Sequence, residues 1–126
     1  MSQIKLSANI IFVTDLARAK QWYEEVMGMK SIDYRPPEFL EMTLGKDHFY
    51  IESENPKRAP GFQKVQIGIR SSAIFAVEDI HQFIEQAKKL GTKIVVEPVQ
   101  QFWGDWNAVI ADPDGNEFVI DAENLK

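Results

Sequence analysis

Side chains that can transfer protons alternate along residues 47–52, where His48 and Tyr50 are followed by Glu52. Residues two apart in a β-strand point to the same side, so these three groups would share one face of a sheet. A histidine or a tyrosine there can act as a general acid or base, and Glu117 is a further candidate. His48 and Glu117 could form an acid–base pair, an improvised metal site or only a solvated strand end. One histidine falls short of the usual ligand set of a metal centre.

Two of the three tryptophans, Trp103 and Trp106, stand just before an apolar stretch and the sequence Asp-Pro-Asp-Gly at residues 112–115. Aspartate first, proline second and glycine fourth are typical of a type I turn between two strands. Large aromatics are common both in ligand pockets and in protein interfaces. Trp103 therefore either contacts a ligand or packs against its own loop or another chain.

An internal repeat carries these residues. The string NEFVIDAEN at 116–124 aligns with DHFYIESEN at 47–55, so that Phe118 falls on Phe49, 69 residues earlier. The string AIFAVEDI at 73–80 aligns with NIIFVTDL at 9–16, so that Asp79 falls on Asp15, 64 residues earlier. Matching strings at both ends, in the same order, predict two copies of one structural unit.

Each copy has the same order of local signals. An apolar strand leads to an aspartate suited to cap a helix, Asp15 or Asp79, and a glycine suited to end it follows at Gly28 or Gly91. Three short strands should then complete a βαβββ unit. The predicted strands are 10–13, 31–35, 39–44 and 49–52 in the first copy, and 73–77, 93–97, 107–111 and 117–121 in the second. We predict one domain over residues 1–126, with units at about 5–54 and 64–124 and a connector at 55–63.

Composition limits the function classes. The 126 residues include no cysteine, which excludes disulfides, thiolate metal sites and a cysteine nucleophile. The formal net charge of −5 argues against a nucleic-acid partner. No stretch approaches the ~20 apolar residues that a membrane span needs. We therefore expect a cytoplasmic protein with neither a nucleic-acid nor a membrane partner.

The paired units, the opening VTDLARAKQWYEEVMGM at 13–29 and WGDWNAVIADPDGNEF at 103–118 resemble the vicinal oxygen chelate superfamily. This superfamily groups glyoxalases, bleomycin-resistance proteins and extradiol dioxygenases. The resemblance implies an α+β fold in which two βαβββ repeats form a curved mixed sheet around an open cavity. It also implies a homodimer, often with sites shared between the chains.

The resemblance further implies four strand positions at which the metalloenzymes of the superfamily hold a divalent metal. In this sequence those positions are Ala8, Tyr50, Ser72 and Val119. None is a normal ligand for zinc, nickel, iron or manganese, which favour imidazole and carboxylate groups. The sequence is thus closest in character to the metal-free bleomycin-resistance branch, and we predict no metal, no cofactor and, on balance, no catalysis.

Strand alternation combined with the resemblance predicts a cavity with an apolar floor and a few polar groups. Trp106 should lie on the helix side, and Trp103 should stand at the cavity mouth. The predicted ligand contacts are Phe12, Tyr50, Trp103, Asn107, Val109 and Val119. The predicted function is to bind a small, partly aromatic molecule without a metal. The alternatives are a metal-dependent lyase or dioxygenase, or a metal-free acid–base enzyme using Tyr50 or His48.

Overall fold

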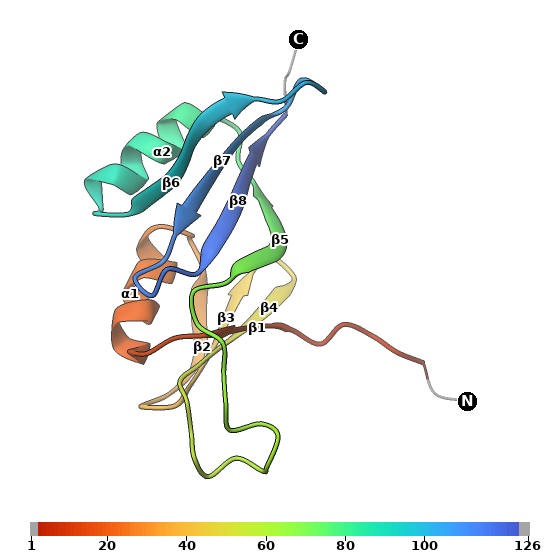
Figure 1. The fold of residues 1–126 in the computed structure, drawn as a ribbon, viewed down its shortest axis with the longest axis vertical. Coiled ribbons are helices and arrows are strands. Elements are labelled where there is room, and N and C mark those ends of the chain that lie inside the picture. The colour runs from red at the N-terminus through yellow and green to blue at the C-terminus, as the bar shows by residue number, and fades with distance from the viewer. Residues whose placement is uncertain (1–2, 124–126) are drawn as a thin grey trace. The chain divides into compact units, whose positions relative to one another are not determined.

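The computed structural model describes residues 3–123, and the chain divides into two compact units between Ile67 and Gly68. Each unit contains one helix and four strands in the order βαβββ (Figure 1). This confirms the α+β class and the two βαβββ repeats. No helix within residues 3–123 has the length and apolar character needed to cross a membrane.

Unit 1 ends at Ile67, and its four strands form one open sheet in the order β1-β4-β3-β2. β1 runs parallel to β4, whereas the other neighbours are antiparallel, so the sheet is mixed. The elements are β1 (Asn9–Phe12), α1 (Leu16–Glu25), β2 (Lys30–Arg35), β3 (Phe39–Leu44) and β4 (Asp47–Glu52).

Unit 2 begins at Gly68 and repeats this topology, with the sheet order β5-β8-β7-β6. β5 is parallel to β8, and the remaining pairs are antiparallel. The elements are β5 (Arg70–Ala76), α2 (Ile80–Lys89), β6 (Lys93–Gln100), β7 (Trp106–Ala111) and β8 (Glu117–Ala122). Strand ends differ from the predicted ones by up to three residues. The hydrogen-bonded ladders of the described residues give one four-stranded sheet to each unit.

The backbone register shows that the two units are copies of one another. Ile10 of β1 is opposite Tyr50 of β4, and Ile74 of β5 is opposite Val119 of β8. These are the pairs that offsets of 64 and 69 residues bring into correspondence. The repeat seen in the sequence is therefore a repeat of strand pairing.

Aspartates begin both helices, as predicted. Asp15 Oδ1 accepts a hydrogen bond from the backbone N–H of Arg18, and Asp79 Oδ1 accepts one from Gln82, each at 3.0 Å. These bonds satisfy N–H groups that have no partner within the first helical turn.

The helices end differently. Gly91 directly follows the C-cap of α2 with φ +81°, as predicted for a glycine that ends a helix. In unit 1, Gly28 also has a positive φ of 70°, but α1 already ends at Glu25. The backbone N–H of Met29 donates to the carbonyl of Tyr23 at 3.0 Å, so a further turn separates the helix from its glycine.

Strand alternation separates the core of each unit from its other face. In β4, Phe49 and Ile51 are buried, whereas His48, Tyr50 and Glu52 are partly exposed. In β8, Phe118 and Ile120 are buried, whereas Glu117, Val119 and Asp121 are partly exposed. The buried residues pack on the side covered by the helix. We call the opposite side of each sheet its open face.

Candidate functional site

Aromatic side chains gather on the open face of unit 1. In β3, Phe39 is opposite Glu52 and Glu41 is opposite Tyr50, so β3 and β4 present these side chains on one face. The rings of Phe39 and Tyr50 pack with their centroids 5.4 Å apart at an interplanar angle of 56°. On the far side of β4, Phe12 of β1 is opposite Glu52. The face therefore offers an aromatic surface bordered by carboxylates.

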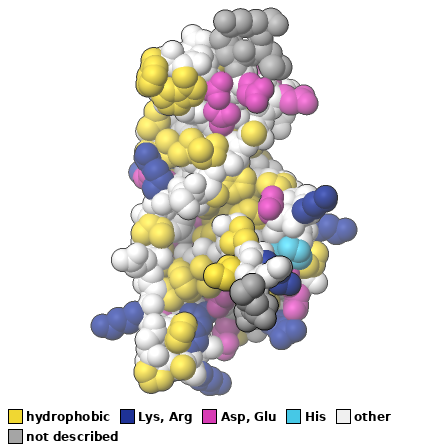
Figure 2. All heavy atoms as spheres, turned by 90° about the vertical axis from the view of Figure 1, so that its right-hand side faces the viewer, with side chains coloured by type: hydrophobic (Ala, Val, Ile, Leu, Met, Phe, Trp, Pro, Cys, Tyr) yellow, Lys and Arg dark blue, Asp and Glu magenta, His cyan; other side chains and the backbone are white. Residues whose placement is uncertain are grey.

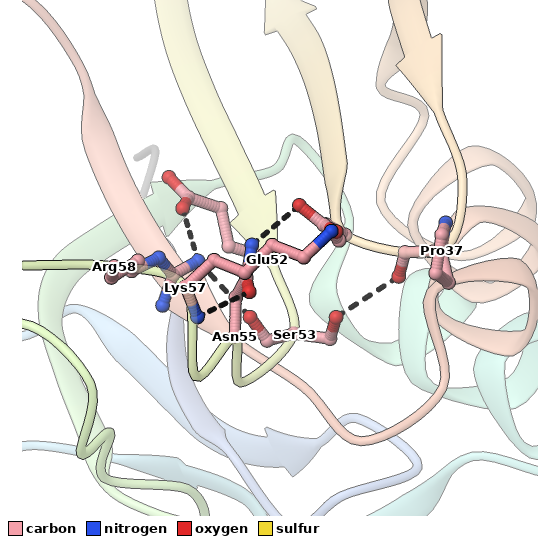
Figure 3. Close-up of polar contacts among 7 residues, drawn as sticks. Pro37, Glu52, Ser53, Asn55, Lys57 and Arg58 are labelled. Carbon is pink, nitrogen blue, oxygen red and sulfur yellow. Dashed lines mark hydrogen bonds and ion pairs between the residues drawn. The ribbon is translucent and has the colours of Figure 1, made fainter.

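Arg58 folds back from the segment after β4 onto this surface. Its guanidinium lies 5.7 Å from the centre of the Phe12 ring. Arg58 Nη2 donates to Glu52 Oε1 and to the carbonyl of Ser53 (Figure 3). The side chains of Arg58 and Glu52 are 19% and 16% exposed. Arg58 Nη1 is buried and has no hydrogen-bond partner within residues 3–123. Arg58 was predicted only as part of the connector, so sequence reasoning missed it.

His48 has a carboxylate partner on the same face. Its Nδ1 lies 2.7 Å from Glu41 Oε2, and the His48 side chain is 43% exposed. A carboxylate on one ring nitrogen fixes the orientation of the imidazole and leaves Nε2 to exchange protons. Glu41 comes from the neighbouring strand β3, and the sequence interpretation did not name it. The contact between His48 and Glu117 stays a prediction.

The open face of unit 2 carries polar side-chain pairs at both ends of β8. Arg70 of β5 binds Glu117 of β8, with Nη2 2.8 Å from Oε1. Asn107 of β7 donates from Nδ2 to Asp121 Oδ1 at 2.7 Å, which fixes the amide of a predicted ligand contact. Val109 is 6% exposed, so this predicted contact is almost fully covered. Val119 is partly exposed between these polar pairs.

Hydrogen bonds within the Asp-Pro-Asp-Gly turn fix the start of β8. The carboxylate of Asp112, which is 4% exposed, accepts hydrogen bonds from the backbone N–H groups of Asp114 and Asn116 and from the Asn116 amide, all at 2.9 Å. Asn116 Oδ1 in turn accepts from the backbone N–H of Gly68 at 2.7 Å. The turn thereby ties the start of unit 2 to the start of β8.

The two tryptophans differ in environment. Trp106 is partly buried and its ring contacts His81 of α2 edge-on, with centroids 5.0 Å apart, which confirms its predicted place on the helix side. His81 is exposed, as predicted. Trp103 is 56% exposed and packs edge-to-face on Phe102, which is 96% exposed. Contact of Trp103 with a ligand stays a prediction.

The four positions implied for a metal do not fit one. Ala8 and Val119 have no donor atom, and Tyr50 and Ser72 carry only hydroxyl groups, which divalent metals of this kind rarely use. Among residues 3–123 no group of three or more histidine, cysteine, aspartate or glutamate side chains is placed to hold a metal ion. These four positions therefore do not supply the imidazole and carboxylate groups that such a metal needs.

Figure 2 shows one side of the molecule with its side chains coloured by type. Apolar side chains are spread over it, with acidic and basic side chains between them. Ile10 is 51% exposed and Ile74 is 66% exposed, although both are strand residues. Within each unit, exposed apolar residues of this kind are common where a surface contacts another molecule.

Comparison with known proteins identifies a matching family and similar solved structures. The family model described as Glyoxalase/Bleomycin resistance protein/Dioxygenase superfamily matches residues 5–120. A lactoylglutathione lyase from Agrobacterium tumefaciens has a similar structure, with a TM-score of 0.77 at 15% identity over 96% of this chain and 95% of that chain. No curated protein matches the chain.

Two further solved structures are similar in fold. A glyoxalase/bleomycin resistance protein/dioxygenase family enzyme from Burkholderia phytofirmans PsJN has a TM-score of 0.77 at 23% identity, over 94% of this chain and 98% of that chain. TioX from Micromonospora sp. ML1 has a TM-score of 0.75 at 17% identity, over 94% and 99% respectively.

Proposed function

Because this chain belongs to the glyoxalase/bleomycin resistance protein/dioxygenase superfamily, we propose that it binds a small, partly aromatic organic molecule on its open faces without a metal. The observation that carries the proposal is Tyr50. It stands at a position where metalloenzymes of the superfamily hold a ligand, and its ring packs on Phe39 instead. A planar molecule stacked on these rings would gain both apolar burial and aromatic contacts.

The electrostatics of the face support an uncharged or weakly polar ligand. Glu52 is paired with Arg58, and Glu41 contacts His48, so the nearby carboxylates already have partners. A ligand would replace water over the rings without leaving a charge unpaired, which is the costly outcome in an apolar site.

The proposal includes a homodimer in the cytoplasm. Each sheet has an edge strand with exposed apolar side chains, at Ile10 in β1 and Ile74 in β5. Open edges of this kind favour association with another strand or chain. The absence of cysteine suits a reducing compartment.

Calorimetric titration with 2-naphthol, a planar aromatic of suitable size, tests the binding site. We expect saturable binding that weakens about tenfold in Tyr50→Ala, because the stacking surface is lost. Tyr34→Ala is the matched control, since Tyr34 is 41% exposed and pairs across β2–β3 with the core residue Leu40, on the opposite side of the same sheet. Equal weakening by both variants, or no saturable binding by the parent protein, would refute the proposal.

A metal-free acid–base enzyme is the second candidate, favoured by the 2.7 Å contact between His48 and Glu41. Proton abstraction needs only one well-placed base. Deuterium exchange at the carbon next to the carbonyl of dihydroxyacetone, followed by proton NMR, measures such an activity. Exchange that the wild type accelerates and His48→Asn abolishes would favour this candidate over simple binding.

A further inference from the structure

Unit 1 contains a concave surface on the side of its sheet that carries α1. We call it the α1 groove; residues 13–17, 36–38 and 53–57 line it, together with Tyr34 and Ile67. Its volume is about 800 Å³, within the range of small-molecule sites. Tyr34 is opposite the core residue Leu40, and Lys20 of α1 lies over its ring at 5.5 Å. The groove is therefore on the other side of the sheet from Tyr50.

Apolar residues and prolines form much of the groove. Val13 and Leu16 are buried, so they form its floor, while Pro36, Pro37 and Pro56 stand at its sides. A proline has no backbone N–H to leave unpaired and has a fixed φ, so these walls lose little freedom when a ligand binds.

Hydrogen bonds hold one wall in place. Ser53 Oγ donates to the carbonyl of Pro37 at 2.9 Å, and the Ser53 backbone N–H donates to the carbonyl of Glu38 at 3.1 Å (Figure 3). Asn55 Nδ2 donates a hydrogen bond to Glu38 Oε2, and Asn55 Oδ1 accepts one from the backbone N–H of Lys57 at 2.9 Å. The β2–β3 turn and the segment after β4 are thus joined into one surface.

The charges around the groove select the kind of ligand. Three carboxylates line it, those of Asp15, Glu38 and Glu54, against the single ammonium of Lys57. Glu54 is exposed, and no hydrogen bond or ion pair occupies its carboxylate within residues 3–123. Two cations stand nearby. Lys20 is paired with Glu24 at 2.9 Å, whereas Arg18 Nη2 donates to the uncharged Thr14 hydroxyl at 3.2 Å and keeps its positive charge. With Arg18 counted beside Lys57, the three carboxylates still exceed the cations by one.

We propose that the α1 groove is a second binding site, for a small organic cation whose amine meets Glu38 and Glu54 while its apolar body lies on Leu16 and the prolines. Charge attraction supplies the selectivity for the amine, and apolar burial supplies the contact area. The site is separate from the open face, and its ligand differs in charge from the molecule proposed for that face.

Titration of the full-length ¹⁵N-labelled protein with 2-phenylethylammonium tests this proposal by NMR. The backbone amide signals of Ala17, Glu38 and Glu54 are expected to shift and saturate. The uncharged analogue 2-phenylethanol should bind at least about fivefold more weakly, since it lacks the charge. Equal affinity for the two compounds, or shifts confined to other residues, would overturn the proposal.

Variants locate the site independently of the open face. The double variant Glu38→Gln/Glu54→Gln should weaken the amine about tenfold, because glutamine keeps the acceptor for Asn55 but removes the charges. Ala17→Phe should fill the groove and abolish the shifts, whereas Gln21→Phe, also at an exposed position of α1, should not. Tyr50→Ala should leave amine binding unchanged. Loss of binding in Gln21→Phe or Tyr50→Ala would contradict the assigned location.

Discussion

Removal of Arg58 tests whether the open face of unit 1 is organised as the structure shows. Arg58→Met keeps the aliphatic part of the side chain over Phe12 but leaves the Glu52 carboxylate, only 16% exposed, without its cationic partner. Breaking a fully buried ion pair from one side costs about 3–5 kcal/mol. Both side chains retain some exposure, so we expect a loss of about 2 kcal/mol in the free energy of unfolding of unit 1.

The double variant Arg58→Met/Glu52→Met distinguishes an ion pair from simple loss of packing. With both charges gone, no carboxylate is left unpaired and the buried Nη1 donor disappears as well. We expect its stability to lie within about 1 kcal/mol of the parent protein, so that the two substitutions are strongly non-additive.

Urea unfolding followed by tryptophan fluorescence measures these differences. Trp22 is the tryptophan of unit 1 and is 8% exposed, so a parent carrying Trp103→Phe and Trp106→Phe reports on that unit alone. An Arg58→Met variant within about 0.5 kcal/mol of this parent would refute the reasoning, as would a double variant whose loss equals the sum of the single losses.

Two further predictions concern stability. Asp112→Ala removes the acceptor of three hydrogen bonds in a buried turn, so it should destabilise unit 2 by about 3 kcal/mol. Asp47→Ala, at the exposed start of β4, should cost less than about 0.5 kcal/mol. Similar losses of the two variants in urea unfolding would contradict the assigned role of Asp112. Hydrogen bonds from Lys20 and then Ser31 lower the pKa of Glu24 below its usual 4.5 in the folded state. The stabilising contribution of Glu24 is therefore present above pH 4.5 and is lost as the pH falls through the lower folded pKa. Glu24→Gln should be slightly less stable than wild type at neutral pH and equal to it in strong acid. A stability difference that persists in acid would show that the charge is not responsible.

The sequence predicted the elements well because each is specified locally. Each signal involves residues that are close in the sequence: a capping aspartate, the apolar stripe of a helix, or the alternation of a strand. Because the chain is a repeat, each signal also occurs once in each unit. The alternation of Phe49 and Ile51 with Tyr50 followed from burial on one side of the sheet, and the structure confirms it. The end of α1 was misplaced because a positive φ at Gly28 is compatible with a turn beyond the helix as well as with its cap.

The partners within the site were harder to predict. The contact between His48 and Glu41 depends on the register of β3 with β4, which the short turn between Leu44 and Asp47 fixes. That turn could have been used to derive the register, since its length determines which residues are opposite. Arg58 gave no such signal, because a long side chain in an irregular segment can reach several carboxylates and only the folded backbone selects Glu52.

Native mass spectrometry of the protein after exchange into excess Zn²⁺ or Ni²⁺, in the presence of 2-naphthol, tests the central claim that ligand binding here needs no metal. We predict a chain that carries the aromatic molecule and no stoichiometric divalent ion, because Ala8, Tyr50, Ser72 and Val119 offer no suitable donor set. One tightly held ion per chain, together with loss of 2-naphthol binding when a chelator removes it, would contradict the claim.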